Sequence, residues 1–287
     1  MTGIWCDTVD IVSMNAAAGG SSLGRGPVFD TSVPNTARIY DFWLGGKENF
    51  EADRHAGNQV EAHIPEVRAG ARANRLFHQR AAVWMAHQGI TQFIDLGAGL
   101  PTADNTHEAV RRVDPAAAVV YVDFDPIVVS HARALLANHD AGIGVVCADL
   151  RDPDEVLGFD EVRSLIDFAR PCGLLATAVL HFITDDEDPA ALLGRYMTAL
   201  APGSRAAFSH MSADHVPAEK VKAFSSIYDG ASQQLTFRTK DQFAAMFAGL
   251  DLIPPGVVFP HEWNPDPSVA SPETTWGYVA AGLKPAP

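Results

Sequence analysis

The 287-residue chain carries 35 acidic and 21 basic side chains, and its net charge of −14 leaves no general positive field for a nucleic-acid backbone. Apolar residues make up 47% of the sequence, which is enough to bury a sizeable core and excludes a chain that is disordered throughout. The longest nearly uncharged apolar stretch, Gly173 to Thr184, is shorter than the ~20 residues that span a bilayer. We therefore expect neither nucleic acid nor a membrane as a partner.

Residues 1–30 are rich in small side chains and are predicted to form a flexible leader. Asp7 and Asp10 stand where a secretory signal needs positive charge and a clean apolar core, so we predict no targeting signal. The three cysteines, Cys6, Cys147 and Cys172, are too scattered for a disulfide framework or a zinc ribbon. A cytoplasmic protein is expected.

Three helices are predicted next, at residues 35–44, 48–63 and 71–88, with Gly45-Gly46 and Pro65 between them. We assign residues 31–70 to an N-terminal helical cap and residues 71–287 to the main domain.

From Thr91 onward, short β-branched runs alternate with amphipathic segments, a pattern typical of a doubly wound α/β sheet. The predicted strands are residues 92–96, 118–123, 144–148, 173–179 and 205–210. The predicted crossover helices are residues 105–113, 126–138, 160–169 and 189–200. An acidic residue lies at or near the end of each of the first three predicted strands, at Asp95, Asp123 and Asp149. These acids are 28 and 26 residues apart, a spacing that is typical of βαβ units. Right-handed crossovers would bring these strand ends to one edge, where ligands bind.

Downstream, helices are predicted at residues 217–228 and 240–250, and a closing hairpin from strands at 256–259 and 274–283. The expected fold is thus a Rossmann-like doubly wound sheet of about seven strands with a helical cap.

The strongest chemical motif is the segment from Asp95 to Thr102, in which a strand with an acidic residue runs into a glycine turn before a helix. Glycine lets the backbone turn sharply and approach a ligand closely. A dinucleotide-binding loop would have a third glycine where Thr102 stands. The Asp95 carboxylate disfavours phosphate and suits a ligand with an amino group and a positive sulfur, such as S-adenosylmethionine, although a tight turn with a capping acid is also compatible with so short a pattern.

Two more acidic strand ends indicate a nucleoside pocket. Asp123 is placed to accept from both vicinal hydroxyls of a ribose, and Phe124 offers a wall for an adenine face. Asp149 is expected one strand further along the edge, where it would accept from the adenine amino group. Each of these acids also has a simpler interpretation as a solvated residue at the end of a strand.

His181 ends the apolar run that passes through Ala178 and Val179. It is a weak catalytic candidate, as a base or a group that orients a substrate, and a wall residue is the simpler interpretation. No other catalytic residue is predicted. His210, Asp214 and His215 fit no recurrent metal-ligand spacing, so no metal is expected.

The order of these motifs over residues 71–283 resembles the class I S-adenosylmethionine-dependent methyltransferases. Residues 34–50, which read PNTARIYDFWLGGKENF, and residues 72–75, which read RANR, are similar to a bacterial branch of these enzymes. The resemblance implies a first cofactor motif at Asp95, Gly97, Ala98 and Gly99, a ribose-binding acid at Asp123, an adenine-side motif at Asp149 and Leu150, and a following segment from Ala178 to His181. Pro101 replaces a glycine found in many such loops and would stiffen the turn.

In this architecture the predicted cap would fold over the methionine end of the cofactor, whose carboxylate is stabilised by a cation or by hydrogen-bond donors. Tyr40 and Arg72 are the candidates, together with Asn74 and Arg75, although the two arginines would equally suit surface ion pairs.

The resemblance thus implies a methyltransferase that uses S-adenosyl-L-methionine and acts on a small-molecule acceptor. One alternative is a non-catalytic module that senses S-adenosylmethionine and signals through the cap. A third hypothesis, an NAD-dependent reductase, is disfavoured by Asp95 and Thr102.

Overall fold

The computed structural model describes residues 31–101, 104–136, 141–228 and 233–286, so the predicted leader and Thr102 lie outside the described residues. Within these ranges seven strands form one sheet in the order β3-β2-β1-β4-β5-β7-β6. The strands are β1 (Gln92–Leu96), β2 (Ala118–Asp123), β3 (Ile143–Cys147), β4 (Gly173–Ala176), β5 (Arg205–Met211), β6 (Asp251–Leu252) and β7 (Gly277–Leu283). The first five strands pair in parallel, and β7 is antiparallel to both of its neighbours. The predicted doubly wound α/β fold is confirmed.

Helices cover both faces of the sheet. One layer consists of α3 (Val67–His87), α4 (Thr106–Arg111) and α5 (Pro126–Leu135), and its core includes Phe77 and Phe93. The other consists of α6 (Pro153–Gly158), α7 (Asp160–Leu165), α8 (Pro189–Ala199) and α10 (Lys240–Ala245), and its core includes Ile94 and Tyr196. Because successive residues of β1 serve opposite cores, Phe93 and Ile94 show directly that both faces are buried.

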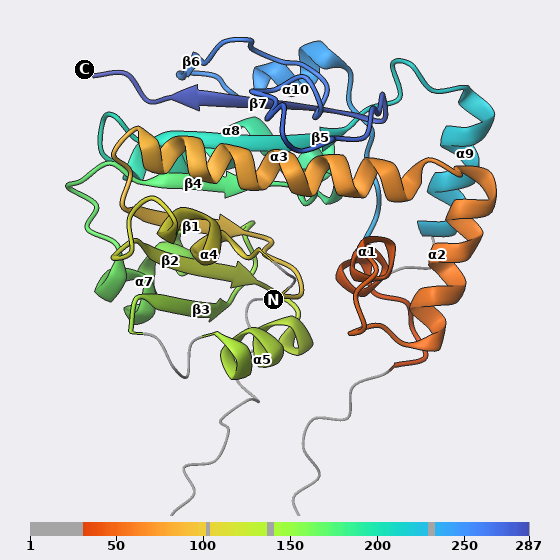
Figure 1. Cartoon of the computed structure of the whole chain (residues 1–287), viewed down its shortest axis with the longest axis horizontal. Coiled ribbons are helices and arrows are strands. Elements are labelled where there is room, and N and C mark those ends of the chain that lie inside the picture. Colours follow the sequence, from red (N-terminus) through yellow and green to blue (C-terminus); the bar gives the residue numbers. More distant parts are fainter. Residues whose placement is uncertain (1–30, 102–103, 137–140, 229–232, 287) are drawn as a thin grey trace, which may run out of the picture.

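The helical region at the N-terminus is built from α1 (Thr36–Leu44) and α2 (Glu51–His63), and α9 (Ala218–Tyr228) joins it from far along the sequence. Figure 1 shows these three helices together, at the end of the molecule toward which β1 and β2 point. Trp43 of α1, Val60 of α2 and Phe224 of α9 share one apolar cluster. The helices therefore stand over the carboxyl ends of the parallel strands, the edge where the sequence predicts a ligand.

Local signals explain where α1 begins and ends. The Asn35 side chain accepts hydrogen bonds from the backbone N–H groups of Ala37 and Arg38, at 2.9 and 3.2 Å, and so caps the first turn. Gly45 ends the helix with a φ of 81°, in the left-handed region that favours glycine. Helix α3, which comes after α2, begins at Val67 and runs continuously across the predicted domain boundary between residues 70 and 71.

Two predicted strands differ from the structure, and one helix was not predicted. The strand predicted at residues 173–179 stops at Ala176, and Ala178 then has a φ of 55°, which a strand cannot accommodate. The strand predicted at 256–259 is reduced to one bridge between Val258 and Val279, and the edge strand beside β7 is β6 at Asp251–Leu252, which pairs with Gly282 and Leu283. Helix α6 was not predicted, although the Asp152 side chain caps its N-terminus and Pro153 stands in its first turn.

Candidate active site

A cavity of about 190 Å³ lies between the carboxyl ends of the parallel strands and the cap helices. Its walls contain most of the predicted site residues, namely Tyr40, Asp95, Gly97, Ala98, Gly99, Asp123, Phe124, Leu150, Ala178, Val179 and His181. Arg72 and Asp149 are not among its lining residues. The topology thus gathers residues from five separate segments into one hollow, as expected at the switch point of a doubly wound sheet.

The glycine turn after β1 is held against the end of β2. The backbone N–H groups of Gly97 and Ala98 both donate to the carbonyl oxygen of Val122, at 2.8 and 3.1 Å. Gly97 and Gly99 have φ values of 65° and 66°, which residues with a side chain rarely adopt. A Cβ atom at Gly97 would collide with the Val179 side chain, whereas at Gly99 it would meet nothing within 4 Å. Gly97 is therefore required for close packing and Gly99 for backbone conformation.

Asp123 is the last residue of β2 and is 8% exposed. One carboxylate oxygen accepts from the Gly99 N–H at 2.9 Å, and the other accepts from the Asp125 N–H at 3.0 Å. Desolvation raises the pKa of Asp123 to about 6 despite these two hydrogen bonds. Since each carboxylate oxygen has a second lone pair, the group can also accept from two donors in the cavity. Phe124, 40% exposed, follows directly and lines the same wall.

A buried polar chain supports Asp95 and contains residues that sequence analysis missed. The Thr106 hydroxyl donates to the Asp95 carboxylate at 2.6 Å, so this hydroxyl must accept from His78 Nε2, 2.7 Å away. His78 Nδ1 is then left to accept from the Thr177 hydroxyl at 2.8 Å. Burial lowers the pKa of His78 well below its ordinary value and raises that of Asp95 to about 6. No sequence motif marks His78, whose partners lie 28 and 99 residues away.

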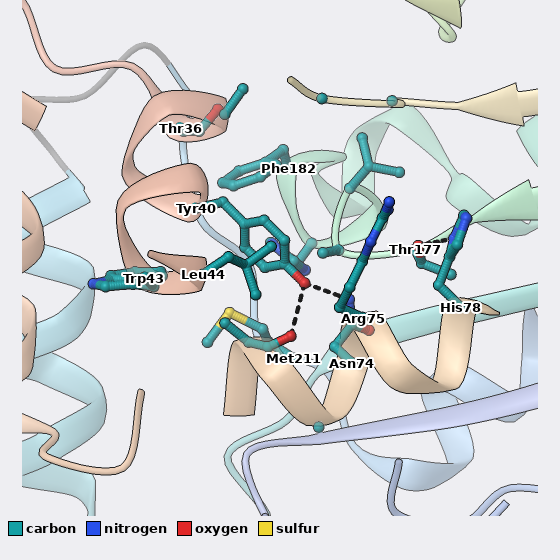
Figure 2. A pocket seen from close by; sticks show the side chains of 18 of the residues that line it. Thr36, Tyr40, Trp43, Leu44, Asn74, Arg75, His78, Thr177, Phe182 and Met211 are labelled. Atoms are coloured by element: carbon teal, nitrogen blue, oxygen red, sulfur yellow. Dashed lines mark hydrogen bonds between the residues drawn. The ribbon is translucent and has the colours of Figure 1, made fainter. Parts of the chain in front are cut away.

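Tyr40 and Arg75 form the wall of the cavity between α1 and α3. The Tyr40 hydroxyl donates to the Ala71 carbonyl at 3.0 Å and accepts from the Asn74 side-chain amide at 2.9 Å, as Figure 2 shows. Arg75 donates from Nη2 to the Asp104 carbonyl at 3.0 Å, while its buried Nε has no partner within the described residues. An unpaired buried donor on a cation is a natural anchor for an anionic group.

The predictions for Arg72 and Asp149 are corrected by their positions. Arg72 is exposed on the outer side of α3, because Ala71, Arg75 and His78 share the inward side at helical spacing. Asp149 accepts from the Arg151 backbone N–H at 2.9 Å and pairs with its guanidinium at 3.2 Å, and its half-exposed carboxylate is not part of the cavity lining. Ala148 and Leu150, on either side of Asp149, are the residues that line the cavity.

His181 lies in the short 3-10 helix η2 (Leu180–Phe182) after β4 and is 6% exposed. Its ring stands edge-on to Phe182 and to His210, with centroid distances of 4.4 and 5.9 Å. Its buried Nδ1 has no hydrogen-bond partner among the described residues. Burial, with His210 and Arg238 nearby, lowers the pKa of His181 well below its ordinary value. The ring is therefore neutral at physiological pH, and its unpartnered Nδ1 is available for a hydrogen bond.

Behind His181, a buried arginine fixes the surrounding backbone. Arg238, 4% exposed, donates to the Ile183 carbonyl and to Asp185, at 2.8 and 2.7 Å. Its Nη1 lies 2.7 Å from His210 Nε2, which therefore accepts, and His210 Nδ1 donates to the Met211 carbonyl at 2.7 Å. Asp214 accepts from Tyr278 and from the Lys240 N–H. His210 and Asp214 are thus engaged within the protein.

Asn35 ties the cap to the cavity edge with one hydrogen bond and joins two cap helices with another. The Asn35 side chain donates to the Asp125 carboxylate at 2.5 Å, and the Asn35 backbone N–H donates to Asp53 at 2.8 Å. Asp53 also pairs with Arg38 at 2.7 Å, with the two side chains 0% and 3% exposed. Residues of the 34–50 segment therefore hold the cap beside the loop that carries Asp123.

A parallel sheet of this strand order, with a final antiparallel strand, a glycine turn after β1 and an acid at the end of β2, defines a Rossmann-like methyltransferase fold. A family model described as S-adenosyl methyltransferase matches residues 24–285. The chain belongs to this family.

Solved structures agree with that assignment. A candidate methyltransferase from Thermobifida fusca YX is 39% identical, with a TM-score of 0.83, over 92% of this chain and 100% of that chain. A DUF574 family protein from Streptomyces avermitilis is 35% identical, with a TM-score of 0.84, over 89% and 99%. The plantazolicin methyltransferase BpumL, solved with a substrate analogue and SAH, shares only the fold, at 12% identity and a TM-score of 0.52 over 87% and 96%. No curated protein matches the chain.

Within the described residues, no helix is long and apolar enough to cross a membrane.

Proposed function

We propose that this chain transfers a methyl group from S-adenosylmethionine to a small-molecule acceptor, and that the cavity described above holds the cofactor. The observation that carries the proposal is Asp123, a buried carboxylate fixed by two backbone N–H groups, with acceptor capacity left for the two hydroxyls of a ribose. A charged acceptor with a raised pKa in a cleft is typical of a site built for binding rather than for stability.

The other residues fit the same cofactor. The turn at Gly97 leaves no room for a Cβ and lets the backbone face a ligand closely. Phe124 and Leu150 supply apolar surface for an adenine ring. The Arg75 Nε is an unpaired donor for a carboxylate.

S-adenosylmethionine, when bound, supplies an activated methyl group on a positively charged sulfur. The protein's contribution is then to position the reactants and to exclude water, so the chemistry needs no nucleophile–base–acid constellation. A small acceptor is favoured because the remaining cavity lies beneath α1 and α9, and because the net charge of −14 disfavours a polyanionic partner.

Titration calorimetry with S-adenosylhomocysteine tests the proposal directly. We expect binding to the wild-type protein, and a roughly tenfold or greater loss in Arg75→Gln, since hydrogen bonds to charged groups contribute about 1.5–3 kcal/mol. Arg72→Gln, on the outer side of the same helix, is the matched control and should bind normally.

A second ligand separates the two ends of the site. 5′-Methylthioadenosine lacks the amino-acid carboxylate, so Arg75→Gln should bind it as the wild type does. Failure of the wild-type protein to bind S-adenosylhomocysteine would refute the proposed function.

A further inference from the structure

The half of the cavity under the cap is apolar and enclosed. We call it the acceptor chamber; its walls are Trp43, Ile64, Phe182, Met211, Phe224 and Trp276. Ile64 and Phe224 are each 1% exposed, and Phe224 lies 6.5 and 6.0 Å, between ring centroids, from Trp43 and Trp276. Four of the six side chains are aromatic, so the chamber favours a flat, apolar ligand.

The two carboxylates that line the cavity nearest the acceptor chamber both have hydrogen-bond donors from the protein. The Asp41 carboxylate accepts from the Glu48 N–H and from the Asn49 side-chain amide, at 3.0 and 2.8 Å. The Glu66 carboxylate accepts from Lys220 Nζ and from Trp276 Nε1, both at 3.1 Å. The Tyr40 hydroxyl is hydrogen bonded to Ala71 and Asn74, and His210 to Met211 and Arg238. No cation is among the described residues that wall the acceptor chamber, and the nearby carboxylates already accept hydrogen bonds, so a charged acceptor would have to displace these partners, and burying an unpaired charge is strongly unfavourable.

His181 differs from these polar neighbours. Its ring lines the cavity beside Phe182, is nine-tenths buried, and has no partner for Nδ1 among the described residues. Two residues earlier, Val179 packs against Gly97 of the glycine turn. His181 therefore stands between the turn proposed to face the cofactor and the acceptor chamber. The charged and titratable groups around it are His210 and Arg238, the latter paired with Asp185.

We infer that the methyl acceptor is an uncharged aromatic hydroxyl compound, whose ring packs in the acceptor chamber and whose hydroxyl hydrogen bonds to His181; this rests on the proposed function. The hydroxyl oxygen forms a bond to the methyl carbon while the sulfur–methyl bond breaks and its electron pair stays on sulfur. The hydroxyl proton passes to the His181 ring, so the positive charge lost from sulfur appears on the imidazole.

A phenolic hydroxyl suits this arrangement better than an aliphatic one. Its pKa is ~10, as in tyrosine, compared with ~16 for water, so transfer of its proton to a neutral imidazole is far less unfavourable. An aliphatic amine is protonated at neutral pH and would have to compete for Asp41 and Glu66, whose carboxylates already accept hydrogen bonds within the protein.

Three probes that share one ring system test the inference: 2-naphthol, the 2-naphthoate anion and the 2-naphthylmethylammonium cation. Each is titrated into the full-length protein saturated with S-adenosylhomocysteine, and binding is followed by calorimetry. We expect 2-naphthol to bind at least tenfold more tightly than either charged probe. A charged probe that binds as tightly as 2-naphthol, or no binding of 2-naphthol, would overturn the inference.

Variants then locate the bound probe. Phe182→Ala and His181→Ala should each weaken 2-naphthol binding threefold or more while S-adenosylhomocysteine binds as in the wild type, which also shows that the variants are folded. Unchanged 2-naphthol affinity in both variants would contradict the assignment. With S-adenosylmethionine, mass spectrometry should detect 2-methoxynaphthalene, and His181→Ala should lower kcat more than it raises KM. If the wild type fails to bind S-adenosylhomocysteine, the proposed function itself fails, which is a separate result.

Discussion

Replacing Asp123 by asparagine should stabilise the ligand-free protein while weakening its binding of the cofactor. Burial raises the pKa of this carboxyl from 3.8 to about 6, so keeping it ionised at pH 7 costs about 3 kcal/mol at 1.36 kcal/mol per pKa unit. Asparagine avoids that cost. Its amide group, however, faces either the Gly99 or the Asp125 N–H, and losing that hydrogen bond removes about 1 kcal/mol.

The expected net gain is therefore about 2 kcal/mol at pH 7, or a Tm increase of about 4 °C in a chain of this size. The difference in stability between Asp123→Asn and the wild type depends on pH. Because the folded-state pKa lies above the unfolded value, the wild type loses stability as pH rises from about 4 to 6, so the advantage of Asp123→Asn should be largest above pH 6 and should disappear near pH 4.

Binding should move in the opposite direction. Asparagine presents no charged acceptor to the ribose hydroxyls, and we expect S-adenosylhomocysteine affinity to fall by roughly 1.5–3 kcal/mol, about tenfold to 100-fold. Differential scanning calorimetry and titration calorimetry measure the two effects separately. Asp241→Asn, at an exposed position on α10, is the control and should change neither. A variant that is less stable than the wild type at pH 7 and binds normally would refute this reasoning.

Three further predictions concern the turn, the cap and pH. Gly97→Ala should weaken S-adenosylhomocysteine binding roughly tenfold more than Gly99→Ala, a difference of about 1.4 kcal/mol, because the two residues share their backbone conformation but only the former collides with Val179; equal losses in calorimetry would contradict this. Arg38→Met should destabilise the fold to urea by about 3–5 kcal/mol, since it leaves the buried Asp53 unpaired. Arg112→Met removes an exposed pair of the same 2.7 Å length and should cost at most about 1 kcal/mol; similar losses in the two variants would argue against the buried pair. S-adenosylhomocysteine affinity should decline as pH falls through about 6, by up to about tenfold per unit, and a flat profile would show that Asp123 does not bind the ribose in its ionised form.

The sequence predicted the fold best where an apolar pattern and an acidic residue near the end of a strand occur together. Strands β1 and β2 were predicted residue for residue, because each is a short run rich in apolar residues with an acid at or near its end. The edge of the sheet was less predictable: Val258 pairs with Val279 at a single bridge, and the two-residue β6 has no pattern of its own. Edge pairing is decided by tertiary packing, which a local period does not encode.

For the candidate site, the sequence located the strand ends but not the direction of each side chain. Asp95 and Asp123 line the cavity, while Asp149 turns to Arg151. Arg75 could have been preferred over Arg72 from helical phase, since Ala71, Arg75 and His78 recur every three to four residues on one side of α3. The contact between Arg238 and His210 joins positions 28 residues apart with no shared motif, so only the three-dimensional structure reveals it.

The cap and the cofactor edge are physically one unit. Asn35 begins α1 with its side-chain oxygen and donates to Asp125 with its amide, and the Asp125 N–H in turn donates to Asp123. The position of α1 and the orientation of the Asp123 carboxylate are therefore linked through three consecutive hydrogen bonds. Because α1 also carries Tyr40 and Trp43, which wall the other half of the cavity, one short segment aligns the proposed ribose acceptor with the acceptor chamber.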